Sequence, residues 1–207
     1  MKTIYFVRHG ESDANVGERF SDDETVSLTQ RGRSQAEALA KRCAKLPIDA
    51  IISSTMPRAS ETAAIISEAI GMPFELSAEF TERPLPISMH GRLRTDEAAR
   101  RILEGWGKKT TEEGDEFERL KDRAGRALTL LADRPESHIL VVSHGFFMRM
   151  VLARVIFGEE FTSDELGHIL RAIPSTEKSH ISVFRYHEDG REDPWKLWVW
   201  NDHAHLG

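Results

Sequence analysis

The 207-residue sequence contains a single cysteine, Cys43, which excludes an intramolecular disulfide and any metal site built from several thiolates. It has no run of about 18 apolar residues that could span a membrane and no charged leader followed by an apolar segment. The 28 basic residues are outnumbered by 34 acidic ones, and the net charge of −6 argues against nucleic acid or an anionic membrane as the main partner. We therefore expect a soluble cytoplasmic protein that meets any anionic ligand in a local basic pocket.

The overall composition is that of a globular protein. Hydrophobic residues make up 40% and charged residues 30% of the chain, which excludes a disordered chain and a coiled coil. The length suits one domain and is too short for two domains with separate cores. We expect residues 1–207 to form a single domain, with Cys43 packed in its core.

Short apolar runs alternate with amphipathic segments along most of the chain, a pattern that predicts alternating strands and helices. The predicted strands are Thr3–Val7, Asp49–Ser53, Phe74–Leu76 and His138–Ser143. The predicted helices are Thr29–Leu46, Pro57–Ile70, Glu116–Asp133 and Phe146–Phe157. A hairpin of Ile181–Tyr186 and Trp195–Trp200 closes the chain around an Asp189-Gly190 turn, with its tryptophans used for packing. Strands joined by crossover helices predict an α/β fold, a three-layer α/β/α sandwich with a mostly parallel central sheet.

Residues 83–113 form the least regular stretch of the sequence. They carry seven basic and five acidic residues, so their local charge is opposite in sign to that of the whole chain. Two interpretations stay open: a helical insertion or lid over the active site, or a solvated helical excursion.

Two predicted strands stop abruptly at a histidine followed by glycine. His9 lies beside Arg8 at the first of these ends, and His144 lies at the second. Ligands of parallel sheets bind beyond the carboxyl ends of the strands, so the two histidines are expected to face each other there. A neutral imidazole can attack phosphorus while guanidinium groups, here Arg8 and Arg58, neutralise the phosphoryl oxygens. The helix that follows Gly145 points its N-terminus at the same place.

Three blocks of sequence, in this order, resemble the signature of the histidine phosphatase superfamily, the phosphoglycerate-mutase-like proteins. They are Phe6-Val7-Arg8-His9-Gly10-Glu11-Ser12 with Asn15, Ser53-Ser54-Thr55-Met56-Pro57-Arg58-Ala59 with Glu61-Thr62-Ala63, and Val141-Val142-Ser143-His144-Gly145. The end of the chain, Asn201 to Leu206, is similar to the tail of many bacterial members. The resemblance therefore extends over nearly the whole sequence.

The resemblance implies a phosphohistidine mechanism that needs no metal and no cofactor. His9 takes the phosphoryl group, and four residues hold its oxygens or contact the phosphate: Arg8, Asn15, Arg58 and His144. The other histidines lack the spacing of a metal site; His203 and His205 lie two residues apart without a cluster of carboxylates.

The resemblance also implies a carboxylic acid from the loop after the third predicted strand, and Glu82 stands where that residue is expected. An alkoxide leaves poorly unless it is protonated, and the same carboxylate can then activate the water that hydrolyses phosphohistidine. Glu79 is close enough in sequence to be the alternative.

We expect a phosphoric monoester hydrolase of the histidine acid phosphatase type that acts on a small phosphorylated metabolite. The first alternative is a cofactor-dependent phosphoglycerate mutase. Mutases resemble one another in an Arg-His-Tyr-containing run after the acid, whereas Glu82 is followed here by Arg83-Pro84-Leu85-Pro86. The second alternative is a non-catalytic phosphate-sensing or scaffold domain, which is disfavoured because every residue that the reaction requires is present.

Overall fold

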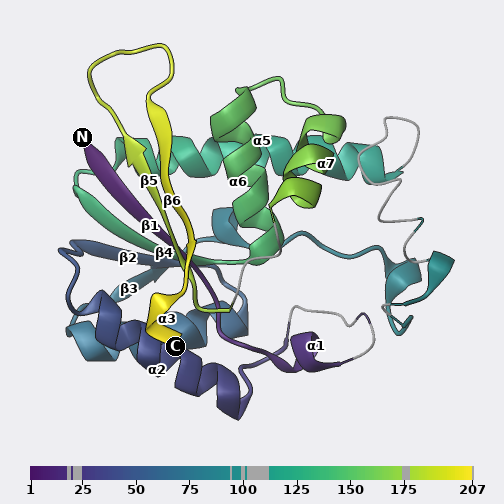
Figure 1. The fold of residues 1–207 in the computed structure, drawn as a ribbon, viewed down its shortest axis with the longest axis horizontal. Helices are drawn as coiled ribbons and strands as arrows, with labels where there is room; N and C mark the ends of the chain where they lie inside the picture. Colours follow the sequence, from purple (N-terminus) through teal and green to yellow (C-terminus); the bar gives the residue numbers. More distant parts are fainter. Residues whose placement is uncertain are drawn as a thin grey trace.

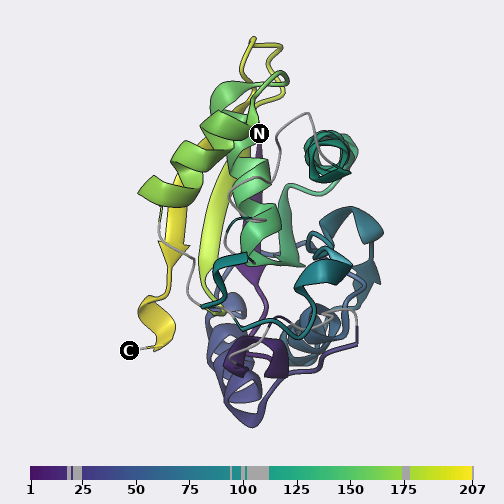
Figure 2. The same cartoon turned by 90° about the vertical axis from the view of Figure 1, so that its right-hand side faces the viewer.

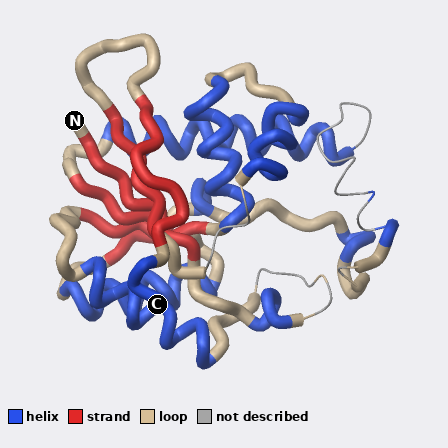
Figure 3. Tube along the Cα trace, viewed as in Figure 1, coloured by secondary structure: helices blue, strands red, loops and turns tan. Residues whose placement is uncertain are grey.

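The computed structural model describes residues 1–17, 20, 25–93, 95–98, 101, 112–173 and 178–206. Their centre is a six-stranded sheet of order β3-β2-β4-β1-β5-β6, shown in red in Figure 3. The strands are β1 (Lys2–Arg8), β2 (Ala50–Ser53), β3 (Phe74–Leu76), β4 (His138–Ser143), β5 (Ile181–Tyr186) and β6 (Trp195–Asp202). The first four strands pair in parallel, and β5 and β6 add an antiparallel edge. The predicted mostly parallel sheet is confirmed.

Helices cover both faces of this sheet, as Figures 1 and 2 show. The helices α2 (Gln30–Cys43) and α3 (Pro57–Ile70) lie on one face, and α5 (Glu112–Asp133), α6 (Gly145–Phe157) and α7 (Ser163–Ala172) lie on the other. Successive side chains of β1 point alternately to the two helix layers, because side chains alternate across a strand. Ile4 and Phe6 pack against α5 and α6, whereas Tyr5 and Val7 pack against α2 and α3. The fold is the expected α/β/α sandwich.

The predicted core residue Cys43 is fully buried between the sheet and the layer of α2 and α3. Burial raises the pKa of its thiol to about 12, so the side chain behaves as a small apolar group. Trp200 of the C-terminal hairpin packs edge-on against Phe184. Trp198 is 61% exposed instead, and the Arg185 guanidinium covers its ring.

Two helices differ from the sequence prediction. α7 was not predicted, although Thr162 and Glu165 form a capping box at its start and its apolar side chains Leu166 and Ile169 are buried. That capping box is the sequence signal for it. The short helix α1 (Asp13–Val16) was also missed, because a single turn has no periodicity to detect.

The proposed lid at 83–113 falls partly outside the described residues, which omit 94, 99–100 and 102–111. Its described part includes the 3₁₀ turn η2 (Ile87–Met89). Met89 is buried against Phe20, whose backbone N–H donates to the Arg92 carbonyl at 2.8 Å. This part of the segment therefore packs on the loop that follows α1, and its role as a lid stays a prediction.

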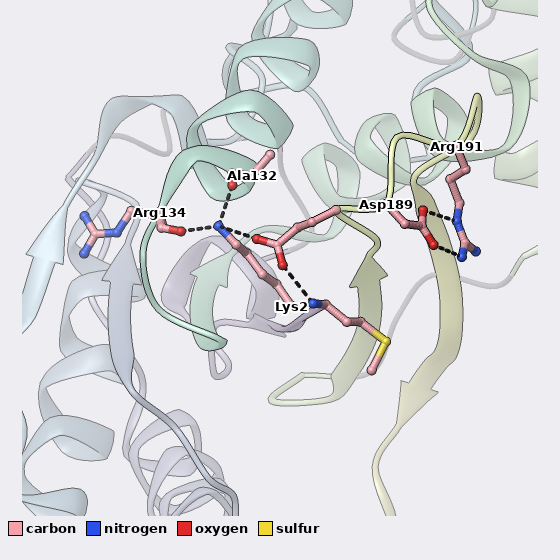
Figure 4. A network of polar contacts seen from close by, with 7 residues as sticks. Lys2, Ala132, Arg134, Asp189 and Arg191 are labelled. Carbon is pink, nitrogen blue, oxygen red and sulfur yellow. Dashed lines mark hydrogen bonds and ion pairs between the residues drawn. The ribbon is translucent and has the colours of Figure 1, made fainter.

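Polar contacts hold the start of β1, the opposite end of the strand from His9. Lys2 is buried, and its ammonium donates to the carbonyl oxygens of Ala132 and Arg134 at the end of α5, as Figure 4 shows. Glu188 from the β5–β6 loop pairs with both Lys2 and the N-terminal amine. These contacts satisfy carbonyl groups at the end of α5 and hold the first residue of β1. Among the described residues, no helix is both long and apolar enough to cross a bilayer.

Candidate active site

The two predicted histidines meet at the carboxyl ends of neighbouring strands. β1 and β4 pair in parallel with Arg8 opposite Ser143, so His9 and His144 follow the last paired residues. Their ring centroids lie 5.0 Å apart. His9 is 3% exposed and His144 is fully buried. The expectation that they face each other is confirmed.

The hydrogen bonds of His9 define which ring nitrogen can react. Its Nδ1 lies 2.6 Å from the carbonyl oxygen of Gly10, and a carbonyl only accepts, so Nδ1 carries the proton. Nε2 therefore keeps its lone pair and accepts from Nε–H of Arg58 at 3.1 Å. Burial, and then the charges of His144, Arg58, Arg8 and Lys178, lower the pKa of His9 well below its usual value. The imidazole is held neutral with Nε2 toward Arg58.

His144 is neutral for the same reason, since burial and then nearby arginine charges lower its pKa well below the usual value. Its Nε2 lies 2.8 Å from Oγ of Ser54, a residue of the second sequence block. Its Nδ1 is buried and meets no hydrogen-bond partner within the part of the chain that the structure describes. A buried ring nitrogen without a hydrogen-bond partner can form a hydrogen bond with an oxygen of a bound ligand.

Arg58 lies at the start of α3, directly after Pro57, and is 2% exposed. A buried guanidinium at this position is costly unless it meets an anion or strong acceptors. Arg8 acts on both histidines through its charge. The predicted cations Arg8 and Arg58 are thus brought together with His9 and His144.

Lys178 is a further cation at this place that sequence analysis missed. Its charge is among those that lower the pKa of His9. The next residue, Ser179, has a positive φ of 58° and donates its backbone N–H to the carbonyl of Arg8 at 3.1 Å. The long-range pairing of β5 with β1 places this turn beside Arg8. The sequence around Lys178 contains no pattern that would predict this position.

The loop after His9 is packed backbone to backbone against the first turn of α2. A Cβ on Gly32 would lie 1.9 Å from the carbonyl oxygen of Glu11, a distance that no side chain tolerates. A Cβ on Gly10 would lie 2.4 Å from the carbonyl oxygen of Gly32. Gly10 also donates its N–H to Thr62 Oγ1 of α3 at 3.2 Å. Both glycines are therefore needed for this close approach.

Asn15 lies in the same loop, but its contacts hold the loop itself. Its Oδ1 accepts from the backbone N–H and the hydroxyl of Ser12, at 3.2 and 3.0 Å. Its role in binding phosphate therefore stays a prediction.

Glu82 lies at the N-terminus of α6, the helix whose N-cap is His144. Its Oε2 accepts from the backbone N–H of Phe146 at 3.1 Å, and its Oε1 accepts from those of Phe147 and Arg83 at 3.0 Å each. The alternative acid, Glu79, instead accepts from Nε of Arg126 at 3.2 Å, on an exposed part of α5. The structure brings Glu82, and not Glu79, to the helix end that also carries His144.

These residues can bind an anion and attack it. The neutral His9 lies close to His144 at the N-terminus of α6 and within reach of the charges of Arg8, Arg58 and Lys178, an arrangement suited to a phosphoryl group. Within the described ranges, no group of three or more His, Cys, Asp or Glu side chains is placed to hold a metal ion.

Comparison with known proteins identifies the family. The sequence profile of the histidine phosphatase superfamily (branch 1) matches residues 4–201. The chain belongs to the histidine phosphatase superfamily. It is 31% identical over 162 residues to a probable phosphoglycerate mutase GpmB from Escherichia coli, a match that covers 75% of each chain.

Solved structures share the fold. YhfR from Bacillus stearothermophilus superposes with a TM-score of 0.79 at 24% identity, over all of both chains. A putative α-ribazole-5′-P phosphatase from Escherichia coli gives 0.77 at 22% identity over 98% of both chains. The phosphoserine phosphatase of Entamoeba histolytica gives 0.76 at 21% identity, again over all of both chains. At these identities the likeness shows the fold alone.

Proposed function

We propose that this protein is a phosphomonoesterase that hydrolyses a small phosphorylated metabolite through a phosphohistidine on His9, without a metal. The observation that carries the proposal is the state of His9. Its tautomer is fixed by Gly10, its Nε2 faces the buried Arg58, and its lowered pKa keeps the nucleophile neutral. A metal-free phosphoryl transfer needs such a nucleophile beside fixed positive charge.

In the first step, Nε2 of His9 attacks phosphorus and the bond from phosphorus to the ester oxygen breaks. Arg8, Arg58 and His144 hold the phosphoryl oxygens, and Glu82 gives its proton to the departing alkoxide. In the second step, Glu82 takes a proton from water, which attacks phosphorus. The phosphorus–nitrogen bond then breaks, and His9 and inorganic phosphate are released.

The lowered pKa of His9 supports the finer assignment to the acid phosphatase type. His9 is a nucleophile only while neutral, and a pKa well below the usual value keeps it neutral in acidic solution. We also propose the cytoplasm as the compartment, since the one cysteine is a buried thiol.

A phosphoglycerate mutase is the second candidate, because the GpmB relative carries that name. A mutase must shield its phosphohistidine from water while the intermediate reorients. Glu82 is followed here by Arg83, which packs on Phe146 at 3.9 Å from the ring centroid, and by the exposed Pro84. This run lacks the His-Tyr pair that mutases carry there, so we infer that water reaches the phosphoenzyme.

The test supplies 3-phosphoglycerate with and without a bisphosphoglycerate primer, and separately a panel of phosphorylated metabolites, after exhaustive chelation of metals. We follow 2-phosphoglycerate and free phosphate. We expect phosphate release from at least one ester, unaffected by the chelator. Primer-dependent isomerisation much faster than phosphate release from every ester would establish the mutase instead, and activity that returns only with added zinc or magnesium would contradict the metal-free mechanism.

A further inference from the structure

The loop that carries Glu82 leaves the sheet beyond β3, its edge strand. Two hydrogen bonds to strand residues hold its first part. Ser77 donates its backbone N–H to the Ser53 carbonyl at 2.8 Å, and Ser143 Oγ donates to the Phe80 carbonyl at 2.7 Å. Both contacts precede Thr81 and Glu82 along the chain. The backbone at the acid itself must be held from elsewhere.

A side chain from α5 holds it. Arg123 donates to the hydroxyl of Thr81, to the Thr81 carbonyl at 2.9 Å and to the Glu82 carbonyl at 3.2 Å. A planar guanidinium fork can hold several acceptors in a fixed direction, which an ammonium group cannot do. Arg123 therefore fixes the backbone at the two residues where the loop turns toward α6.

The same guanidinium also contacts α6. Its carbon lies 4.7 Å from the centroid of the Phe147 ring, and the backbone N–H of Phe147 is a donor to the Glu82 carboxylate. Arg123 thus contacts both the backbone that carries the carboxyl group and the residue that holds its oxygen.

The charges agree with this placement. Burial lowers the pKa of Arg123, and the negative charge of Glu82 acts in the opposite direction. The charge of Arg123 also contributes to the lowered pKa of His144. Arg123 is therefore within electrostatic reach of both the acid and His144.

We propose that Arg123 is a positioning residue for the general acid, which holds Glu82 so that its carboxyl group faces the leaving oxygen. This inference rests on the proposed function, in which Glu82 protonates that oxygen. A misplacement of about 1 Å can cost up to about a hundredfold in rate. Loss of Arg123 should therefore weaken proton donation more than phosphoryl binding.

The chain offers a matched control one turn along the same helix. Arg126 donates to the Glu79 carboxylate in the same loop, but its side chain is 58% exposed and its partner is not the proposed acid. Arg126→Gln removes a cation of equal charge from α5 and leaves the Glu82 contacts in place.

The experiment measures kcat/KM on two esters, glycerol phosphate with a poor leaving group and 4-nitrophenyl phosphate with a good one. We expect Arg123→Gln to lose about tenfold more activity on the alkyl ester than on the aryl ester. In Arg123→Lys the ratio of the two kcat/KM values should lie between that of Arg123→Gln and that of the wild type. Arg126→Gln should keep the wild-type ratio. In the double variant with Glu82→Gln, Arg123→Gln should change the ratio no further. The far-ultraviolet circular dichroism spectrum checks the fold of each variant.

Equal losses on the two esters, or the same change of ratio in Arg126→Gln, would overturn the positioning role. Should Arg123→Gln fail to fold, Thr81→Val removes one acceptor without altering α5, and it should shift the ratio in the same direction by a smaller factor. An unchanged ratio in both Thr81→Val and Arg123→Lys would also overturn it. A wild-type protein that hydrolyses neither ester nor any metabolite of the panel would instead contradict the proposed function.

Discussion

His9 and Glu82, the two residues proposed to carry the chemistry, are held in place in different ways. His9 directly follows β1, which lies between β4 and β5 inside the sheet. Glu82 stands in a loop beyond the edge strand β3, and contacts from α5 and α6 hold it. The position of the nucleophile is thus set by the sheet, whereas the position of the acid depends on a few contacts. Substitutions around His9 should affect all esters equally, and the effect of substitutions around Glu82 should depend on the leaving group.

The largest effect is expected for Arg58→Met. The side chain is buried and donates to Nε2 of His9, so its substitution removes both that donor and a positive charge beside the nucleophile. We expect kcat/KM to fall by about 10²–10³-fold on alkyl and aryl esters alike, as for loss of one oxyanion donor. Arg119→Met, at an exposed position of α5, is the control and should be near wild type. A loss confined to the alkyl ester would contradict a role in phosphoryl binding.

Glu82→Gln should have the second-largest effect, and it should distinguish the region around Glu82 from the region around His9. Glutamine keeps the size of the side chain but cannot give a proton, so we expect a loss of about 10²-fold on an alkyl phosphate and much less on a nitrophenyl ester. Glu79→Gln is the matched control, because Glu79 pairs with Arg126 in the structure. Equal losses on both esters in Glu82→Gln would assign Glu82 a structural role.

Gly32→Ala tests the backbone contact between α2 and the loop that follows His9. A Cβ there would lie 1.9 Å from the Glu11 carbonyl oxygen, so the loop after His9 must move. We expect a loss of stability of about 1–3 kcal/mol, typical of overpacking, and lower activity on both esters. Gly167→Ala, where the nearest atom belongs to the flexible end of Arg171, is the control for urea denaturation. Equal stability of the two variants would show that the contact is not tight.

His9 and His144 could be predicted from the sequence because their positions follow from local patterns. Each stands where an apolar run stops, and parallel pairing brings such ends together. Arg123 and Lys178 could not be found in this way. Arg123 is one of many polar residues along α5, and its partners lie more than 40 residues away in sequence, at Thr81 and Glu82. Lys178 reaches His9 only because β5 pairs with β1.

The choice between Glu79 and Glu82 was open for a similar reason. The sequence places both residues in one loop, and their spacing does not say which carboxylate faces the sheet. The tertiary contacts distinguish them, since the N-terminus of α6 binds Glu82 and the exposed Arg126 binds Glu79.

Lys178→Met should have the smallest effect, a shift in pH dependence. The lysine charge disfavours protonation of His9 and so lowers its pKa. Without that charge the pKa of His9 rises, and the acid limb of the kcat/KM profile should move to higher pH. Lys45→Met, at an exposed position of the chain, is the control and should leave the profile unchanged. A shift to lower pH, or none, would show that Lys178 does not act on His9.

The most direct test of the central claim is to trap the phosphoenzyme. The protein is mixed briefly with a ³²P-labelled ester that it hydrolyses, quenched, and divided between acid and base. We expect a phosphoryl label that is stable in base and labile in acid, as phosphohistidine is, located on His9 by mass spectrometry of the peptides. His9→Ala should lose the label together with nearly all turnover. A label of the same lability that persists in His9→Ala would contradict the account.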